Sequence, residues 1–366
     1  MNIKKLHPDF KLNGFTFTEK TLKDAAYSFI KEGEPYEKAI GAFLFDWLDD
    51  KFSIQVQTSG STGVRKSIWL QKEQMTNSAI TTGHFFELHP AATSLLCLSA
   101  DYIAGKMMLV RAMVLGLHLD CVAPNSEPLK GNAKKYSFCA MVPLQVENSL
   151  KSLANIEKLI IGGAPVSYSL KQKLKSVDCS VYETYGMTET ITHVAVKRID
   201  SALSSPSSLK RLKDAALDRF IALSNVIFST DNRACLVISA PKISNNPVIT
   251  NDIVKLISET EFEWLGRFDN VINSGGVKLH PEIIEEKLTS VISHRFFVAG
   301  LPDESLGQKL VLIIESKADE KNYSNIETFS AILDKYEMPK AIFFLTKFAL
   351  TKNGKLSRRE TILLIE

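Results

Sequence analysis

The sequence predicts an α/β fold, with a large N-terminal domain of helix-covered mixed sheets followed by a small α+β C-terminal domain. Three observations support this prediction. The 366 residues, 45% of them hydrophobic, are enough to build two buried cores. Short apolar runs alternate with helical segments between residues 94 and 186. From about residue 267 the chain changes to shorter strands and helices, so we divide it into domains 1–268 and 269–366.

The first fifty residues favour helices. Residues 21–50 are expected to form two of them, and the second places its apolar side chains at helical spacing, at Ile40, Phe43, Leu44, Trp47 and Leu48. The run FSIQVQ (52–57) then alternates apolar and polar residues, which is typical of a strand with one buried face.

Apolar strands and helices then follow one another in turn. The expected strands are 94–99, 118–123, 138–142, 158–163 and 180–186, and the expected helices are 103–116 and 144–152. A strand-then-helix order favours a mostly parallel sheet covered by helices. Further along, residues 226–238 are expected to form a hairpin that turns at Asp231-Asn232.

Charge and composition exclude several classes of protein. The net charge of +3 is too close to balance for a nucleic-acid-binding surface. The N-terminus lacks the apolar core of a signal peptide, and the longest apolar segment (103–119) is short and contains Lys106 and Arg111, so no membrane span is expected. Five cysteines without a C-x-x-C pair predict reduced, buried thiols. These features favour a cytoplasmic protein, in which oligomerisation is possible.

The stretch TSGSTGVRK (58–66) is typical of a loop that binds phosphate. It combines two glycines, four hydroxyl side chains and two cations directly after a strand candidate. Read from Gly60, it matches the Walker A pattern G-x-x-x-x-G-K-[ST], except that Arg65 stands in place of the second glycine. A P-loop NTPase or kinase is therefore one alternative, and an ordinary Ser/Thr/Gly turn is another.

Motifs further along the chain favour a different chemistry. A Walker-type site needs an acidic residue at the end of an apolar strand, and no strand candidate ends that way. Seven motifs instead occur in order: TSGSTGVRK (58–66), IGGAPVS (161–167), YGMTE (185–189), TND (250–252), GRFDN (266–270), NSGGVKLHP (273–281) and LTKNGKLSR (350–358).

On these motifs the chain resembles the adenylate-forming superfamily of acyl-CoA synthetases, peptide-synthetase adenylation domains and luciferases. The resemblance extends from Thr58 to Arg359. Arg65 replaces a usual proline, and Asn251 replaces a usual glycine. Because asparagine tolerates positive φ better than other side chains, we expect the second departure to have little consequence.

The resemblance implies that ATP activates a carboxylate to an acyl adenylate, with Mg²⁺ and coenzyme A as the further cofactors. The implied nucleotide-binding residues are Thr58, Ser59, Gly60, Ser61, Thr62, Gly63, Lys66, Gly162, Gly163, Ala164, Tyr185, Gly186, Asp252 and Arg267. Of these, Tyr185 would stack on adenine, Asp252 would accept the ribose hydroxyls and Arg267 would reach the ribose. Two catalytic residues are also implied: Thr188 would contact the α-phosphate and Glu189 would bind Mg²⁺.

Residues of the C-terminal domain complete the implied site. Lys355 is the third implied catalytic residue, with its charge placed between the substrate carboxylate and the α-phosphate. In this family the small domain is mobile and swings about a hinge at the position of Asp269. After that rotation, Gly275 and Gly276 would line the path of the thiol.

Two features concern the acid. Only 57 residues precede the phosphate loop, fewer than the family usually has, which favours a small acid. The short length and the segment 99–116 resemble the o-succinylbenzoate–CoA ligases of menaquinone biosynthesis, although a histidine common there is Tyr102 here.

Two cations in the apolar segment 103–119 give independent evidence about the acid that is bound. Lys106 and Arg111 are expected to be buried, and a buried cation needs a partner. That partner is either a second carboxylate of the substrate, with His193 and Arg198 as further candidates to bind it, or solvent or a structural Asp or Glu. Another aryl- or acyl-CoA ligase and a carrier-loading adenylation enzyme stay open as alternatives.

Overall fold

The structure is a computed structural model that describes residues 6–57, 67–199, 219–316, 329–350 and 356–365. Several predicted site residues lie outside the described residues: Thr58, Ser59, Gly60, Ser61, Thr62, Gly63, Lys66 and Lys355.

The described helices and strands follow the order expected from the sequence. The helices are α1 (Glu19–Glu32), α2 (Pro35–Leu48), α3 (Lys72–Phe85), α4 (Ile103–Leu115), α5 (Pro143–Ser149), α6 (Tyr168–Leu174), α8 (Pro281–Leu288) and α9 (Arg358–Ile362). The strands are β1 (Lys11–Leu12), β2 (Phe15–Thr16), β3 (Ser53–Gln57), β4 (Ser67–Gln71), β5 (Thr93–Leu96), β6 (His118–Cys121), β7 (Tyr136–Met141), β8 (Ile156–Ile161), β9 (Ser180–Gly186), β10 (His193–Arg198), β11 (Phe220–Ala222), β12 (Ile227–Thr230), β13 (Cys235–Ser239), β14 (Val248–Ser258), β15 (Glu261–Arg267), β16 (Ile272–Ser274), β17 (Val277–Leu279), β18 (Phe296–Asp303), β19 (Gly307–Glu315) and β20 (Ala341–Leu345). The expected strand 180–186 coincides with β9, and the expected hairpin at 226–238 is formed by β12 and β13.

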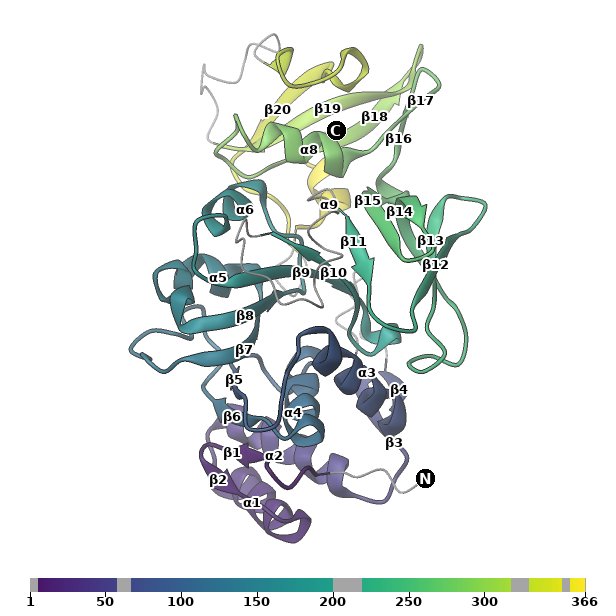
Figure 1. The fold of residues 1–366 in the computed structure, drawn as a ribbon. Helices are drawn as coiled ribbons and strands as arrows, with labels where there is room; N and C mark the ends of the chain where they lie inside the picture. The colour runs from purple at the N-terminus through teal and green to yellow at the C-terminus, as the bar shows by residue number, and fades with distance from the viewer. Residues whose placement is uncertain (1–5, 58–66, 200–218, 317–328, 351–355, 366) are drawn as a thin grey trace.

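Within the described residues, thirteen strands form one mixed sheet in the order β12-β13-β14-β15-β11-β10-β9-β8-β7-β5-β6-β1-β2 (Figure 1). From β1 through β6, β5, β7 and β8 to β9, each strand runs parallel to the next, as the strand-then-helix order predicts. Beyond β9 each strand runs antiparallel to its neighbour in the sheet. The predicted α/β fold with mixed, helix-covered sheets is confirmed.

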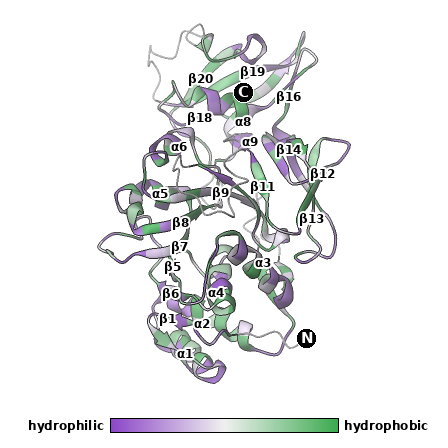
Figure 2. Ribbon diagram, viewed as in Figure 1, coloured by the Kyte–Doolittle hydropathy of each residue, from purple (hydrophilic) through white to green (hydrophobic). Residues whose placement is uncertain are grey.

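Helices cover both faces of the parallel strands, and successive residues of one strand therefore enter two different cores. On β8, Ile160 packs into a core that includes residues of α2, α3 and α4. Its neighbours Leu159 and Ile161 pack into a second core that includes residues of α5 and α6. Figure 2 shows α4 as largely hydrophobic, and its buried positions span most of the helix. A charged residue on this helix therefore needs an explanation.

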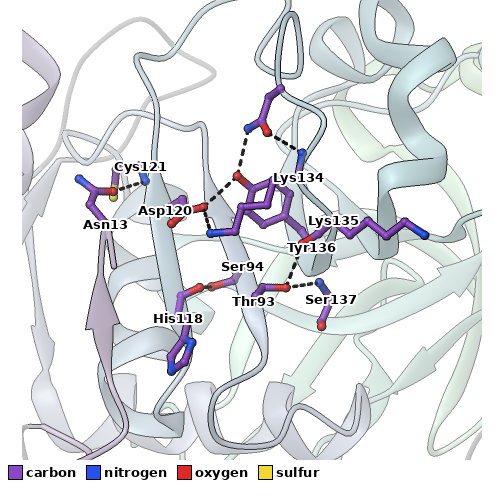
Figure 3. A network of polar contacts seen from close by, with 11 residues as sticks. Asn13, Thr93, Ser94, His118, Asp120, Cys121, Lys134, Lys135, Tyr136 and Ser137 are labelled. Carbon is purple, nitrogen blue, oxygen red and sulfur yellow. Dashed lines mark hydrogen bonds and ion pairs between the residues drawn. The ribbon is translucent and has the colours of Figure 1, made fainter. Parts of the chain in front are cut away.

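Polar side chains tie together the strands at one end of the large sheet (Figure 3). Asp120 accepts hydrogen bonds from Lys134 Nζ at 2.6 Å and from the Tyr136 hydroxyl at 3.0 Å. Burial raises the pKa of Tyr136 to about 12. Asn13 Oδ1 accepts from the Cys121 amide at 2.8 Å and so fixes the chain after β1 against β6. A surface hollow at the β6–β7 connection contains none of the predicted site residues.

Two smaller sheets complete the described structure. Strands β3 and β4 pair as an antiparallel hairpin, and the connection between them is the predicted phosphate loop. The second sheet is formed by β16 to β20 and lies at the top of Figure 1. Its core is closed by α8, through Ile284 and Leu288.

Helix α8 also contacts the large sheet region. Lys171 of α6 forms an ion pair with Glu286 of α8 at 2.9 Å. A side chain at Gly266 of β15 would collide with Glu282 of α8, since the carboxylate lies 2.4 Å from the place a Cβ would take. The domain boundary at 268/269 and the mobility of the second domain stay predictions. No helix in the described part of the chain is both long and apolar enough to cross a membrane.

Candidate active site

The motif residues of the large domain meet where β8 and β9 end. These parallel neighbours finish at the same edge of the sheet, so the glycines that follow Ile161 lie beside Tyr185 and Gly186. Gly163 has a φ of +82°, a conformation that side chains rarely adopt. At Gly186 a Cβ would lie 2.2 Å from the Thr192 carbonyl oxygen, so only glycine fits there.

Tyr185, Asp252 and Arg267 form one connected group. The Tyr185 hydroxyl donates to Asp252 Oδ2 at 2.7 Å, and Arg267 Nη1 lies 3.5 Å from Asp252 Oδ1. Asp252 and Arg267 are brought together because they are register partners on β14 and β15. Burial and the neighbouring Asp252 raise the pKa of Tyr185, so its hydroxyl remains a donor at neutral pH. The structure therefore holds the predicted adenine and ribose residues side by side.

Replacing Tyr185 with phenylalanine is expected to raise KM for ATP about tenfold. The ring stays, but Asp252 loses its closest donor, and a hydrogen bond to a charged group contributes about 1.5–3 kcal/mol. KM for ATP in a pyrophosphate-release assay measures this effect. Tyr168→Phe, on the exposed side of α6, is the matched control. An unchanged KM in Tyr185→Phe would mean that this hydroxyl does not orient the ribose-binding carboxylate.

The turn after β9 presents Thr188 and Glu189 at the same edge. They belong to a short 3₁₀ turn, η2 (Thr188–Thr190), in which the Thr190 hydroxyl accepts from the Met187 amide at 3.0 Å. The turn closes through Ile191, which is buried with a φ of 63°. A β-branched residue at positive φ is strained, which is a common feature of functional turns.

Glu189 is exposed and carries the predicted metal site alone. Among the described residues, no group of three His, Cys, Asp or Glu side chains could hold a metal ion. Mg²⁺ suits such a place when phosphate oxygens and water provide its other ligands. The single carboxylate of Glu189 therefore fits a magnesium ion that is bound together with the nucleotide.

Arg111 and His193 form a buried polar cluster beside this edge. Arg111 of α4 is 1% exposed and His193 at the start of β10 is 4% exposed. Arg111 Nη2 lies 3.5 Å from His193 Nδ1 and 3.4 Å from Thr192 Oγ1, and no described group accepts from Nε. Burial lowers the pKa of Arg111 to about 9, so it is still a cation at neutral pH. The predicted buried cation therefore lies beside neutral partners among the described residues.

Lys106 has a different environment, although it lies on the same helix. Five positions along an α-helix turn the side chain by about 140°, so Lys106 and Arg111 face different surroundings. Lys106 Nζ donates to the Ala100 carbonyl at 2.7 Å and lies 5.1 Å from the centre of the Phe43 ring. Lys106 is only half-buried, so the expectation that it is a buried cation was wrong, and its ammonium group has partners without a substrate carboxylate. Arg198, at the other end of β10, lies over the Tyr182 ring instead of beside Arg111.

Residues around Asp269 are held by side-chain contacts. Asn251 Nδ2 donates to Asp269 Oδ2, and Arg267 Nη2 lies 3.9 Å from the same oxygen. Asn251 lies within β14 and is not at positive φ, so tolerance of positive φ is not the reason it fits here, and the expectation that it has little consequence stays a prediction. Its amide binds the predicted hinge residue, a contact that the family's glycine could not make.

Gly275 and Gly276 are not brought to the nucleotide residues. They connect β16 and β17, and a side chain at Gly276 would meet no atom within 4 Å. At Gly275 it would meet only Leu306, from the same sheet region. Their role on the path of the thiol stays a prediction.

Two neighbours of His193 were missed by sequence reasoning. Thr82 of α3 lies 3.4 Å from His193 Nε2, and Thr192 lies 3.4 Å from Nδ1. Thr82 stands in no motif, and α3 shows little separation of apolar and polar faces, so the sequence carried no signal for it. Thr192 follows YGMTE directly, and a search for polar residues after that motif could have found it.

Comparison with known proteins agrees with this fold and these motifs. The sequence profile of the AMP-binding enzyme family matches residues 50–213. An acyl-CoA synthetase (AMP-forming)/AMP-acid ligase II-like protein from Dyadobacter fermentans is 35% identical, with a TM-score of 0.60, over 94% of this chain and 98% of that one. The chain belongs to the AMP-binding, adenylate-forming enzyme family. Within it, the relatives place the chain among AMP-forming acid–CoA ligases, and the P-loop NTPase alternative is wrong.

Individual relatives resemble the chain more distantly. A 2-succinylbenzoate–CoA ligase from Lactococcus lactis is 24% identical over 98% of this chain and 80% of its own length. The o-succinylbenzoate coenzyme A synthetase of Bacillus subtilis, solved with ATP and magnesium ion, has a TM-score of 0.69 at 16% identity, over 87% of this chain and 74% of that one. At this identity the structural likeness concerns the fold alone.

Proposed function

We propose that this protein is an o-succinylbenzoate–CoA ligase that uses Mg-ATP and coenzyme A. In the first step a carboxylate oxygen of the acid attacks the α-phosphorus of ATP, and the bond to the pyrophosphate oxygen breaks. In the second step the CoA thiolate attacks the acyl carbon, and AMP leaves as the thioester forms. The similarity to 2-succinylbenzoate–CoA ligases supports the assignment of the acid.

The described residues would support the first step by holding the nucleotide. Tyr185, Asp252 and Arg267 would bind the adenosine part, since they lie together at one edge of the sheet. Thr188 and Glu189 follow at the same edge, where the triphosphate would lie. Bound Mg²⁺ would neutralise phosphate charge there. Lys355 is proposed to stabilise the charge that develops between carboxylate and α-phosphate.

The burial of Arg111 without an anionic partner among the described residues is the single observation that favours a diacid as the substrate. Arg111 is fully buried, it is a cation at neutral pH, and among the described residues it has no anionic partner. An unpaired buried charge is costly, and a carboxylate is the partner whose geometry a guanidinium matches best. The carboxylate of o-succinylbenzoate that is not activated would meet this need. Lys106 is satisfied by Ala100 and is not needed for it.

A pyrophosphate-release assay over a panel of acids tests the proposal. We expect o-succinylbenzoate to turn over with a higher kcat/KM than benzoate or a medium-chain fatty acid, because only the diacid pairs with Arg111. A faster benzoate or fatty acid would overturn the diacid assignment and leave the family membership intact. A carrier-loading enzyme would instead release pyrophosphate but make no thioester with free coenzyme A.

A further inference from the structure

We infer that His193 is a positioning residue for acid specificity: as the neutral Nε2–H tautomer, it directs the Arg111 guanidinium toward the second carboxylate. The inference rests on the proposed function, because it assumes that Arg111 binds that carboxylate. It assigns His193 no contact with the substrate. This changes the role expected from the sequence, in which His193 was itself a candidate ligand.

The tautomer follows from the partners of Thr82. The Thr82 hydroxyl donates its hydrogen to the Ser78 carbonyl at 2.9 Å, as helical threonines commonly do. Its oxygen can then only accept from His193 Nε2, which lies 3.4 Å away. Nε2 therefore carries the hydrogen. A neutral imidazole has one N–H group, so Nδ1 is left as an acceptor.

The acceptor nitrogen faces Arg111. Nδ1 lies 3.5 Å from Nη2 of Arg111 and 3.4 Å from the Thr192 hydroxyl oxygen. A protonated imidazole would place a second cation against a buried guanidinium, which is unfavourable without a counter-ion. Burial and Arg111 accordingly lower the pKa of His193 well below its usual value. The histidine is thus a permanent acceptor in this position and does not compete with Arg111 for an anion.

The Arg111 guanidinium has N–H groups that remain available to a ligand. It has five N–H groups, of which Nη2 serves His193 and Thr192, while Nη1 reaches only the weak acceptor sulfur of Met108 at 3.7 Å. No described group accepts from Nε, although it is buried. Phe86 packs against the His193 ring at a centroid distance of 6.4 Å and restrains its rotation. Thr82 of α3 therefore orients His193, and His193 in turn orients the Arg111 guanidinium that is proposed to bind the second carboxylate.

Two amide substitutions separate the roles of the two ring nitrogens. The side-chain oxygen of asparagine can take the place of Nδ1, whereas glutamine reaches the place of Nε2 and leaves no acceptor at Nδ1. We expect His193→Gln to raise KM for o-succinylbenzoate about tenfold relative to KM for the monomethyl ester of the carboxylate that is not activated. His193→Asn should retain most of that selectivity. Thr82→Val should weaken it a few-fold, because the ring loses its acceptor for Nε2–H.

Controls make each outcome decisive. His84→Gln, an exposed histidine on α3, should leave the KM ratio of diacid to ester unchanged, and thermal unfolding of each variant reports damage to the fold. If Arg111→Met abolishes the selectivity and His193→Gln does not, this inference fails and the proposed function stands. If Arg111→Met leaves the selectivity intact, the proposed diacid site itself is wrong. Equal losses in His193→Asn and His193→Gln would contradict the assignment of Nδ1 as the acceptor.

Discussion

Replacing Lys355 with alanine is expected to slow adenylate formation by about 10²–10³-fold, the range seen when one donor to a transition state is removed. The reason is electrostatic, because negative charge accumulates between the attacking carboxylate and the α-phosphate. A cation that is already positioned there stabilises the transition state without having to reorient. Given pre-formed acyl adenylate, the same variant should transfer the acyl group to coenzyme A at close to the parent rate. Single-turnover measurements of the two half-reactions test this directly.

Two further variants sharpen that test. Lys352→Ala removes a neighbouring lysine of the same motif and should leave both half-reactions unchanged. Asp269→Pro should have the opposite effect to Lys355→Ala, sparing adenylation and blocking thioester formation, because it removes the contact with Asn251 and restricts the proposed hinge. Equal damage to both half-reactions in Lys355→Ala would contradict the alternation of domains.

Replacing Arg111 with methionine is expected to raise KM for o-succinylbenzoate by about 30- to 150-fold. This corresponds to about 2–3 kcal/mol, the contribution of a charge-assisted hydrogen bond in a buried place. KM for ATP should hardly change, since Arg111 makes no contact with Tyr185 or Asp252. Equal rises in both KM values would instead indicate damage to the fold.

The same substitution at Lys106 distinguishes the two cations of α4. Its ammonium group is already bound by Ala100 and Phe43, so Lys106→Met should change KM for the acid much less than Arg111→Met. A larger rise in KM for the acid in Lys106→Met than in Arg111→Met would indicate that the second carboxylate binds at Lys106, on another face of α4.

Much of the fold was predictable because its signals are local. The alternation of apolar runs with helices predicted the parallel strands, and β9 begins and ends where the sequence indicated. The motifs predicted Tyr185, Asp252 and Arg267 as one group, and the structure joins them by direct contacts. The antiparallel half of the sheet was harder to predict, since β11 and β15 pair across a long stretch of chain.

The parts that escaped prediction depend on tertiary packing. The apolar segment around Lys106 and Arg111 predicted two buried cations, but the structure buries only Arg111 and leaves Lys106 half-buried beside a carbonyl and a ring. Asn251 was considered for its backbone, whereas its side chain binds Asp269. Thr82 and His193 are 111 residues apart, and no local pattern connects them. Polar contacts between distant elements were thus the least predictable part of the site.

The most direct test of the proposed function is the rate of CoA thioester formation, measured by mass spectrometry with Mg-ATP, coenzyme A and each acid in turn. We predict that o-succinylbenzoate gives its CoA thioester with one AMP and one pyrophosphate for each product molecule, at a higher kcat/KM than benzoate or a medium-chain fatty acid. A faster thioester from either monoacid, or adenylate formation without any CoA thioester, would contradict the proposed function.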